Sequence, residues 1–378
     1  MATTKKDPVL VVLQLTGAND YLNTIIPYTN PHYKDARPRL GIPEDQVLPI
    51  NDELGFNPNM GPVKDLYDQG KVAIIHGIGY ENSPRSHFRS MDIWHTCEPD
   101  TLGTEGWAAK VIRDLDPRGE NVLKGVNFGQ GLPRSLALRG VPVTSVSNLE
   151  SYGVLSDVPA LAGAESRNRV LERFARMYAP AVGTGPVMDY LADTGQNVLK
   201  GADIIQTAPQ KYSSTVEYAD TPIAQSLKSV AQVYLADLGT QLFYTAHGSF
   251  DTHFNQAPAH TKLWIDTSRA ISDFFADMKE HDAGDNLIMM LFTEFGRRVK
   301  DNGTGTDHGA GGVAFVIGNG VKGGMYSEYP SVRPEDLQQG DLAPNYDFRG
   351  FYATVIDKWL GLDPDPIVGG KFEQLAFV

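Results

Sequence analysis

The segment Pro8-Val-Leu-Val-Val-Leu-Gln-Leu-Thr-Gly17 is almost continuously apolar and rich in β-branched residues. A run of this kind is typical of a strand that is buried on both faces of a mostly parallel sheet. It leads directly into Gly17-Ala-Asn-Asp20, a turn-forming sequence that brings a carboxylate to the end of the strand. The sequence therefore predicts a buried strand with a polar residue just beyond its carboxyl end.

Three further apolar runs have the same shape and end in polar, glycine-bearing sequence, at residues 71–79, 286–293 and 312–318. Between these runs, apolar residues recur at steps of three and four, which is typical of amphipathic helices. The clearest helical patterns cover residues 62–69, 224–238 and 261–278. Strands that alternate with helices predict an α/β protein with a layered sheet.

The pattern changes between residues 125 and 221, where the expected elements are short and small residues are frequent. The strand-like runs before and after this region look like parts of one interrupted sheet. We therefore expect residues 1–378 to form a single α/β domain, with residues 125–221 as an insertion or cap within it. The length alone would also allow two or three domains.

The composition excludes several classes of protein. Asp plus Glu number 46 against 33 for Lys plus Arg, and the formal net charge of −13 argues against binding to a nucleic-acid backbone. With 41% apolar and 21% charged residues, the chain can bury a large core. The single cysteine, Cys97, excludes an intramolecular disulfide and a thiolate-clustered metal site. No apolar run approaches the roughly 18 residues that a membrane span needs.

The compartment and the oligomeric state stay open at this point. Lys5 and Lys6 precede the first apolar run, but that run covers only about seven residues and has no small-residue cleavage site. We expect a strand there instead of an export leader. The protein is periplasmic or extracellular if a leader was removed, and cytoplasmic otherwise.

Carboxylates and imidazoles gather at the expected strand ends, where ligands bind in open α/β sheets. These groups are the ligand set for divalent cations such as zinc, manganese or magnesium, so the sequence predicts a metal site. The candidate ligands are Asp20 after the first run, Asp251 and His253 after residues 241–245, Glu294 after residues 287–292, and Asp307 and His308 in a glycine-rich loop.

Most of these residues also have a structural alternative. Asp20 could form a turn or cap a helix, and the pair Asp251 and His253 could be hydrogen-bonded within a loop. Residues 307–308 could belong to a flexible surface loop. Glu294 is harder to explain in this way, because a carboxylate at the mouth of a buried strand needs a partner.

Ser86 is the candidate nucleophile. Ser83 can cap a helix that begins at Pro84, which would place Ser86 in the first turn. The helix dipole and the free amide groups there favour a deprotonated oxygen or a bound anion, and a nearby cation would make the serine a competent nucleophile. Arg85 and Arg89 could hold a phosphate or sulfate by paired hydrogen bonds. In the structural alternative, Ser86 only reinforces the start of the helix.

Three familiar functional patterns do not apply to this chain. The segment Gly318-Asn-Gly-Val-Lys-Gly323 matches the Gly-x-Gly-x-x-Gly pattern of dinucleotide-binding proteins, but the sequence after it suits a turn better than the start of a helix. The absence of a Gly-x-Ser-x-Gly elbow argues against an α/β-hydrolase triad. The absence of a Gly-x-x-x-x-Gly-Lys-Ser/Thr loop excludes a P-loop nucleoside triphosphatase.

Five ordered segments carry a resemblance to a known family. They are Leu15-Thr-Gly-Ala-Asn-Asp20-Tyr-Leu-Asn-Thr24, Arg85-Ser-His-Phe88, Phe250-Asp-Thr-His-Phe-Asn-Gln256, Thr293-Glu-Phe-Gly-Arg297 and Gly305-Thr-Asp-His-Gly309. Together they resemble the signature blocks of a largely uncharacterised bacterial family in the alkaline phosphatase-like, sulfatase-like superfamily, over about residues 8–360. The resemblance implies a three-layer α/β/α sandwich with a mostly parallel mixed sheet and up to two metal ions at the strand ends.

The resemblance also implies roles for individual residues. Asp20 and Glu294 would share one metal ion, with the Ser86 hydroxyl bridging as the nucleophile, and Arg297 would bind the phosphate or sulfate group. Sulfatases carry Cys or Ser two residues before a Pro. Because position 82 is Asn here, a formylglycine nucleophile is not supported.

A second metal ion would be held by the remaining candidates. The resemblance assigns Asp251, His253 and His308 to it. Asp307 would be either a further ligand or the group that orients His308.

We therefore expect a metal-dependent hydrolase of phosphate or sulfate esters that uses one or two divalent ions, namely zinc, manganese, magnesium or calcium. Its substrate would be a small-molecule or glycan anionic ester. An alternative from a different class is a non-catalytic, metal-containing protein that binds an anionic glycan or a surface partner. A third is a metal-dependent esterase or lyase whose substrate contains neither phosphorus nor sulfur.

Overall fold

The computed structural model describes residues 6–149, 170, 173, 176, 201 and 204–378. Its centre is a nine-stranded sheet with the order β11-β5-β10-β9-β1-β8-β6-β7, and β12 also pairs with β5. A small second sheet has the order β2-β4-β3. The strands are β1 (Val9–Leu15), β2 (Ile25–Ile26), β3 (Leu48–Pro49), β4 (Gly55–Phe56), β5 (Val72–Gly79), β6 (Gly125–Phe128), β7 (Thr144–Val146), β8 (Leu242–His247), β9 (Leu287–Phe292), β10 (Gly312–Gly318), β11 (Gly324–Tyr326) and β12 (Tyr346–Asp347).

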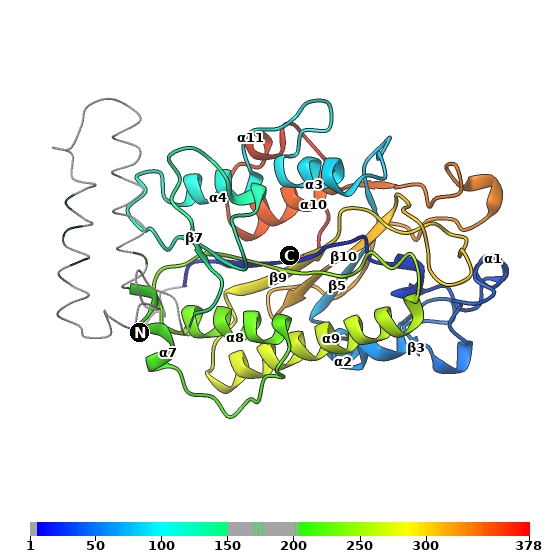
Figure 1. The fold of residues 1–378 in the computed structure, drawn as a ribbon, viewed down its shortest axis with the longest axis horizontal. Helices are drawn as coiled ribbons and strands as arrows, with labels where there is room; N and C mark the ends of the chain where they lie inside the picture. Colours follow the sequence, from blue (N-terminus) through cyan, green and yellow to red (C-terminus); the bar gives the residue numbers. More distant parts are fainter. Residues whose placement is uncertain (1–5, 150–169, 171–172, 174–175, 177–200, 202–203) are drawn as a thin grey trace.

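Helices cover both faces of the large sheet (Figure 1). The α-helices in the described residues are α1 (Pro31–Ala36), α2 (Gly61–Asp68), α3 (His87–Thr96), α4 (Trp107–Leu115), α7 (Ala208–Lys211), α8 (Pro222–Leu235), α9 (Gln256–Glu280), α10 (Phe348–Thr354) and α11 (Asp365–Val368). All four apolar runs expected to be strands form β1, β5, β9 and β10. The expected helical pattern 261–278 lies within α9, whereas the patterns 62–69 and 224–238 extend one and three residues past the ends of α2 and α8.

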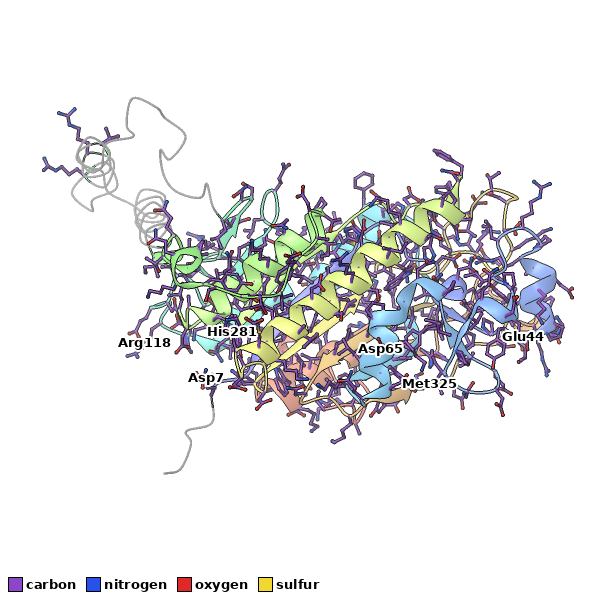
Figure 2. All side chains as sticks on the ribbon, turned by 90° about the horizontal axis from the view of Figure 1, so that it is seen from below. Asp7, Glu44, Asp65, Arg118, His281 and Met325 are labelled. Atoms are coloured by element: carbon purple, nitrogen blue, oxygen red, sulfur yellow. The ribbon has the colours of Figure 1, made fainter. Side chains whose placement is uncertain are left out.

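Alternate residues of β1 belong to two different cores, because successive side chains of a strand point to opposite faces of the sheet. Val11 lies in a cluster with residues of α2, α8 and α9, whereas Val12 lies in a cluster with residues of α3, α4, α10 and α11. Figure 2 shows the first of these faces, with Asp65 on α2 and His281 just beyond α9. The protein is therefore a three-layer α/β/α sandwich, as the family resemblance implied.

Helix α9 begins five residues before the predicted pattern. Asn255 adopts a left-handed backbone conformation with φ 52° immediately before the helix, and Pro258 stands in the first turn, where a missing amide hydrogen costs no helical hydrogen bond. The helix buries Trp264, Ile271 and Phe274 against the sheet, at steps of seven and three residues. These contacts place the start of α9 next to the loop that leaves β8.

The sheet is mixed, and its single antiparallel strand decides which loops meet. β1 pairs in parallel with β8 and β9, so the residues that follow these three strands lie at one edge. β10 runs antiparallel to both β9 and β5, so that the residues before β10 reach this same edge. An isolated bridge between Arg297 and His308 continues the antiparallel pairing beyond the strands.

The sheet extends into the region where we expected an insertion. β6 pairs in parallel with β8, and β7 pairs in parallel with β6, so both strands of this region belong to the main sheet. Of the remainder of the expected insertion over 125–221, most of residues 150–203 lies outside the described residues. The insertion itself stays a prediction.

The start of α3 differs from the predicted start. The helix begins at His87, and Ser86 is its N-cap, so Ser83 does not cap a helix that starts at Pro84. Arg85 has a φ of 52°, a left-handed conformation that interrupts any helix before Ser86. In the described part of the chain, no helix combines the length and the apolar character that a membrane crossing requires.

Candidate metal centre

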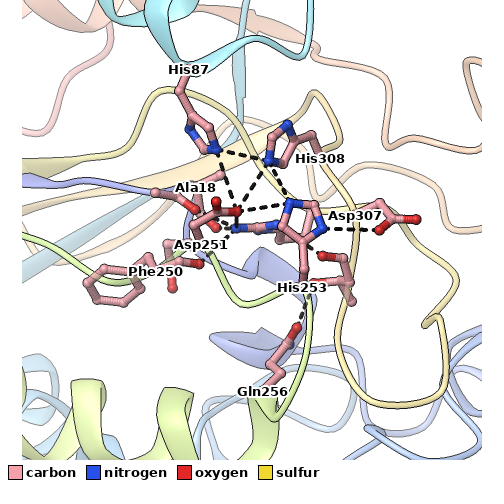
Figure 3. A network of polar contacts seen from close by, with 12 residues as sticks. Ala18, His87, Phe250, Asp251, His253, Gln256, Asp307 and His308 are labelled. Atoms are coloured by element: carbon pink, nitrogen blue, oxygen red, sulfur yellow. Dashed lines mark hydrogen bonds and ion pairs between the residues drawn. The ribbon is translucent and has the colours of Figure 1, made fainter.

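Three histidines surround one carboxylate oxygen at this edge of the sheet (Figure 3). Nε2 of His308 lies 2.9 Å from Nε2 of His87 and 2.9 Å from Nε2 of His253. Oδ1 of Asp251 lies 3.5, 3.1 and 3.2 Å from Nε2 of His87, His253 and His308, respectively. We refer to these four residues as the histidine cluster.

The four members of the cluster come from three separate segments of the chain. Asp251 and His253 stand between β8 and α9, His87 is the first residue of α3, and His308 lies before β10. Close backbone packing holds these loops together. A Cβ at Gly305 would lie 2.3 Å from the carbonyl carbon of His253, so only glycine lets the two loops approach in this way.

The first loop after β1 is packed against the cluster in the same manner. Gly17 has a φ of 109°, and a Cβ there would lie 2.4 Å from the backbone nitrogen of Asp251. The amide of Gly17 also donates a 2.9 Å hydrogen bond to Oε1 of Glu294. A side chain at position 17 would therefore displace Asp251 or break this hydrogen bond.

The second ring nitrogen of every cluster histidine has an acceptor. Nδ1 of His87 lies 2.8 Å from Oε1 of Glu294, and Nδ1 of His253 lies 3.2 Å from Oδ1 of Asp307. Nδ1 of His308 lies 2.9 Å from the backbone carbonyl of Arg85. A hydrogen bond from Nδ1 to such an acceptor fixes the tautomer and turns the Nε2 lone pair toward the cluster, as in metal-ligating histidines.

This donor set fits a divalent cation. With Nδ1 protonated in all three rings, the Nε2 lone pairs face one another at 2.9 Å without a hydrogen atom between them. A cation bound between them would satisfy these lone pairs together with the carboxylate. The possible ligand atoms of His87, Asp251 and His308 all lie within 4.8 Å of one another, and imidazole with carboxylate suits zinc, manganese or related ions.

Glu294 stands behind His87 rather than inside the cluster. Its side chain is 2% exposed and also accepts a hydrogen bond from the Thr293 hydroxyl. Burial raises the pKa of this carboxyl, but the hydrogen bonds from His87 and from the amide of Gly17 outweigh it, so the pKa lies below its ordinary value. Glu294 is therefore ionised and orients the His87 ring.

Asp20 is not brought into the cluster. Its two oxygens lie 2.6 and 3.0 Å from the guanidinium nitrogens of Arg37, and Gln256 donates a further hydrogen bond to it. Both Asp20 and Arg37 are buried. We had expected Asp20 and Glu294 to share a metal ion. The geometry instead places Asp20 in a buried ion pair that occupies both of its oxygens.

Arg297 and Arg85, both expected to meet the substrate, are held by the protein. The Arg297 side chain is 0% exposed, lies 2.6 Å from Oδ1 of Asp251 and donates to the carbonyls of residues 17, 18, 250 and 306. It therefore fixes the loops of the site from behind. Nε of Arg85 lies 2.5 Å from Oδ2 of Asp341. Burial raises the pKa of the Asp251 carboxyl, but the hydrogen bond and charge of Arg297, together with the contacts to His308 and His253, outweigh burial and bring that pKa to about 2.

Three further comparisons with the sequence concern Asp307, Ser86 and His87. Asp307, expected as a ligand or as the partner of His308, contacts His253 instead. The Ser86 side chain makes no capping hydrogen bond, although Ser86 is the N-cap of α3. No local pattern around His87 predicted a role for this residue. Its position was the one signal, because His87 directly follows Ser86 in a segment already assigned to the site.

A hollow of about 510 Å³ opens beside the cluster. It is lined by His87, Asp251 and Glu294. Further residues of α3 and Arg134, from the loop after β6, line it as well. A small anionic molecule could therefore contact the cluster from this side.

The family model described as "Protein of unknown function (DUF1501)" matches residues 189–372, a little under half of the chain. This stretch includes Asp251, His253, Glu294, Asp307 and His308. No curated protein sequence matches the chain significantly.

Several solved structures are similar to this chain at low sequence identity. The C-terminal periplasmic domain of EcEptC from Escherichia coli, in complex with zinc, has 10% identity and a TM-score of 0.41, covering 94% of this chain and 83% of that one. The PsFucS1 sulfatase from Pseudoalteromonas sp. has 11% identity and a TM-score of 0.43, with 98% and 71% covered. A protein in the alkaline phosphatase superfamily from Vibrio parahaemolyticus has 11% identity and a TM-score of 0.39, with 97% and 70% covered.

Proposed function

We propose that this protein is a metal-dependent hydrolase of phosphate or sulfate esters. The observation that carries the proposal is the convergence of three Nε2 atoms on Oδ1 of Asp251 beside an open hollow. His87, Asp251, His253 and His308 would hold one divalent cation. Bound there, the cation would act as a Lewis acid toward the ester oxygens.

Ser86 is the proposed nucleophile. It directly precedes His87, lies at the N-terminus of a ten-residue helix and does not use its hydroxyl for capping. In the proposed reaction its Oγ bonds to phosphorus or sulfur while the ester bond breaks, and the leaving alcohol takes up a proton as the serine gives one up. Water then attacks the same centre, the bond to Oγ breaks, and the serine regains a proton as phosphate or sulfate is released.

The residues behind the cluster keep its ligand atoms in place. Glu294 and Asp307 hold the rings of His87 and His253 in one tautomer, which stabilises the arrangement of the ligand atoms. Arg297 neutralises Asp251 from the buried side and ties its loop to the loops after β1 and before β10. Preorganised ligands need no rearrangement when an anionic ester arrives.

Metal analysis combined with an ester panel tests the proposal. The purified protein is loaded with zinc or manganese and assayed with 4-nitrophenyl phosphate, bis(4-nitrophenyl) phosphate, 4-nitrophenyl sulfate and 4-nitrophenyl acetate. We expect bound metal and turnover of a phosphate or a sulfate. Ser86→Ala should keep the metal and lose roughly 1,000-fold or more in kcat, whereas the nearby control Ser83→Ala should keep both.

Other outcomes separate the alternatives. Stoichiometric metal without turnover of any ester would favour a metal-containing binding protein for an anionic glycan or a surface partner. Turnover of the acetate alone would favour an esterase. Full activity in Ser86→Ala would remove this serine as the nucleophile while leaving the metal site intact.

A further inference from the structure

Arg89, Asp92 and Arg134 form a group of three charged side chains, of which Asp92 and Arg134 line the hollow beside the histidine cluster. Asp92 on α3 accepts a hydrogen bond from Arg89, and its Oδ1 lies 2.8 Å from Nη1 of Arg134. The Asp92 side chain is only 6% exposed. One carboxylate between two guanidinium groups leaves this group with a surplus of one positive charge.

Arg134 is the cationic member of this group that lines the hollow. Its side chain is 45% exposed and, like Asp92, lines the hollow, whereas Arg89 does not. Arg89 is also occupied by the carbonyls of Glu98 and Pro99. Asp92 and the carbonyl of Gly103 hold the Arg134 guanidinium in position. A guanidinium fixed in this way loses little side-chain entropy when it binds a further anion.

Two apolar side chains also line the hollow. Phe88, which follows the cluster residue His87, is 93% exposed and lines the hollow together with Met91. His95 lines it too, and burial lowers the pKa of this histidine to about 4, so it adds no positive charge near neutral pH. A ligand that fills the hollow thus meets the cluster residues His87 and Asp251, two apolar side chains and the cationic side chain of Arg134.

We infer that Arg134 is a specificity-determining residue that binds a second anionic group on the alcohol portion of the substrate. The substrate class is an ester whose phosphate or sulfate lies at the histidine cluster. Its ring or other weakly polar body lies against Phe88 and Met91, and a carboxylate or second ester anion meets Arg134. The inference rests on the proposed function in one respect, namely that the group bound at the histidine cluster is a phosphate or a sulfate.

Stable analogues test this inference without any turnover. Phenylphosphonate is compared with 3- and 4-carboxyphenylphosphonate, and benzenesulfonate with its 3- and 4-carboxy derivatives, by titration calorimetry on the zinc-loaded protein. In the unmodified protein, we expect one carboxylated member of at least one series to bind about tenfold more tightly than its parent, as a charge-assisted hydrogen bond allows. Tighter binding of the phosphonates would indicate a phosphate ester as the substrate, and tighter binding of the sulfonates would indicate a sulfate ester.

Three variants assign the preference to one side chain. Arg134→Gln should abolish the advantage of the carboxylated ligand and leave the parent ligand bound within about twofold. The matched control Arg139→Gln removes the same charge from an exposed residue that does not line the hollow, and should keep the advantage. Arg134→Lys retains the charge without the planar fork, and the advantage should fall about threefold.

The inference is overturned if the carboxylate gives no advantage in the unmodified protein, or if neither series binds at all. Retention of the full advantage in Arg134→Gln also overturns it. If the glutamine variant does not fold, as judged from its melting temperature, an unchanged advantage in Arg134→Lys overturns it instead. The analogues are not hydrolysed, so the binding preference can be measured in a protein that turns over no phosphate or sulfate ester. A lack of such turnover would contradict the proposed reaction and would leave the binding preference standing.

Discussion

The Nε2 atoms of His87 and His308 lie 2.9 Å apart, while Nδ1 of each ring faces an acceptor of its own. Two neutral imidazoles with Nδ1 protonated cannot form a hydrogen bond between their Nε2 atoms, because both offer only a lone pair. A cation between the two rings satisfies both lone pairs at once. This relationship is the geometric basis for proposing a cation at the cluster.

Metal binding should therefore depend on His308 more than on any outer residue, because its Nε2 lies close to both other cluster histidines. We expect His308→Ala to lower zinc affinity by more than the roughly 10- to 100-fold that is typical for loss of an outer partner. Elemental analysis after dialysis against a competing chelator measures the effect. His32→Ala, on α1, is the control and should retain the metal. Unchanged metal content in His308→Ala would contradict the assignment of the centre.

Loss of an orienting carboxylate should weaken the metal without removing a ligand. Glu294→Gln keeps the shape of the side chain but replaces the ionised acceptor of His87. We expect zinc affinity to fall roughly 10- to 100-fold, with the protein still folded. Competition with a fluorescent chelator gives the affinity, and the exposed Glu53→Gln is the matched control. A complete loss of binding, as large as that in His308→Ala, would point to Glu294 as a direct ligand.

The Asp20–Arg37 pair should govern stability rather than metal content. Asp20→Asn leaves the fully buried Arg37 guanidinium without its counter-charge, which typically costs about 3–5 kcal/mol. Urea unfolding should show this loss, whereas Asp35→Asn, an exposed change on α1, should be nearly neutral. The folded Asp20→Asn protein should still bind zinc. Loss of zinc with unchanged stability would restore Asp20 as a ligand.

Protonation of His76 should lower the free energy of unfolding in acid. This histidine is buried in β5 beside Tyr21, and burial lowers its pKa to about 4 from an ordinary value of 6.5. The folded state therefore binds fewer protons than the unfolded state, so stability is fully present above pH 6.5 and is lost as the pH falls toward 4. The full loss from this residue is about 3 kcal/mol.

The variant His76→Asn isolates this contribution. The variant cannot take up a proton in this range, so its free energy of unfolding should change less between pH 6.5 and 4 than that of the unmodified protein. Urea unfolding at several pH values measures both slopes. The buried residues His95 and His260 also have lowered pKa values and should leave a smaller acid dependence in place. Equal slopes in the two proteins would contradict the assignment.

Several parts of the fold and site could be predicted from local sequence. β1 and β9 are short apolar runs that can only be buried on both faces, and α9 follows from its helical spacing. Asp251 and Glu294 were expected to be site residues because polar residues beyond apolar, strand-like runs must find partners or ligands. These signals depend on the neighbours of each residue along the chain.

Other parts depend on packing between distant segments. The antiparallel direction of β10 brings His308 to the edge where His87 begins α3, and no local pattern encodes that direction. Asp20 and Arg297 are charged residues that the sequence suggested for the site. In the structure, Asp20 is buried in an ion pair with Arg37. Arg297 is buried against backbone carbonyls and Asp251, so it stands behind the cluster.

The sequence by itself determined the layered α/β class, the buried strands and most of the residues that meet at one edge, because hydrophobic periodicity and strand-end polarity are local properties. The tertiary structure alone decided which side chains point into the cluster and which stand behind it. That choice depends on distances between atoms far apart in the chain, on burial, and on which hydrogen-bonding groups each side chain can reach after the sheet has formed.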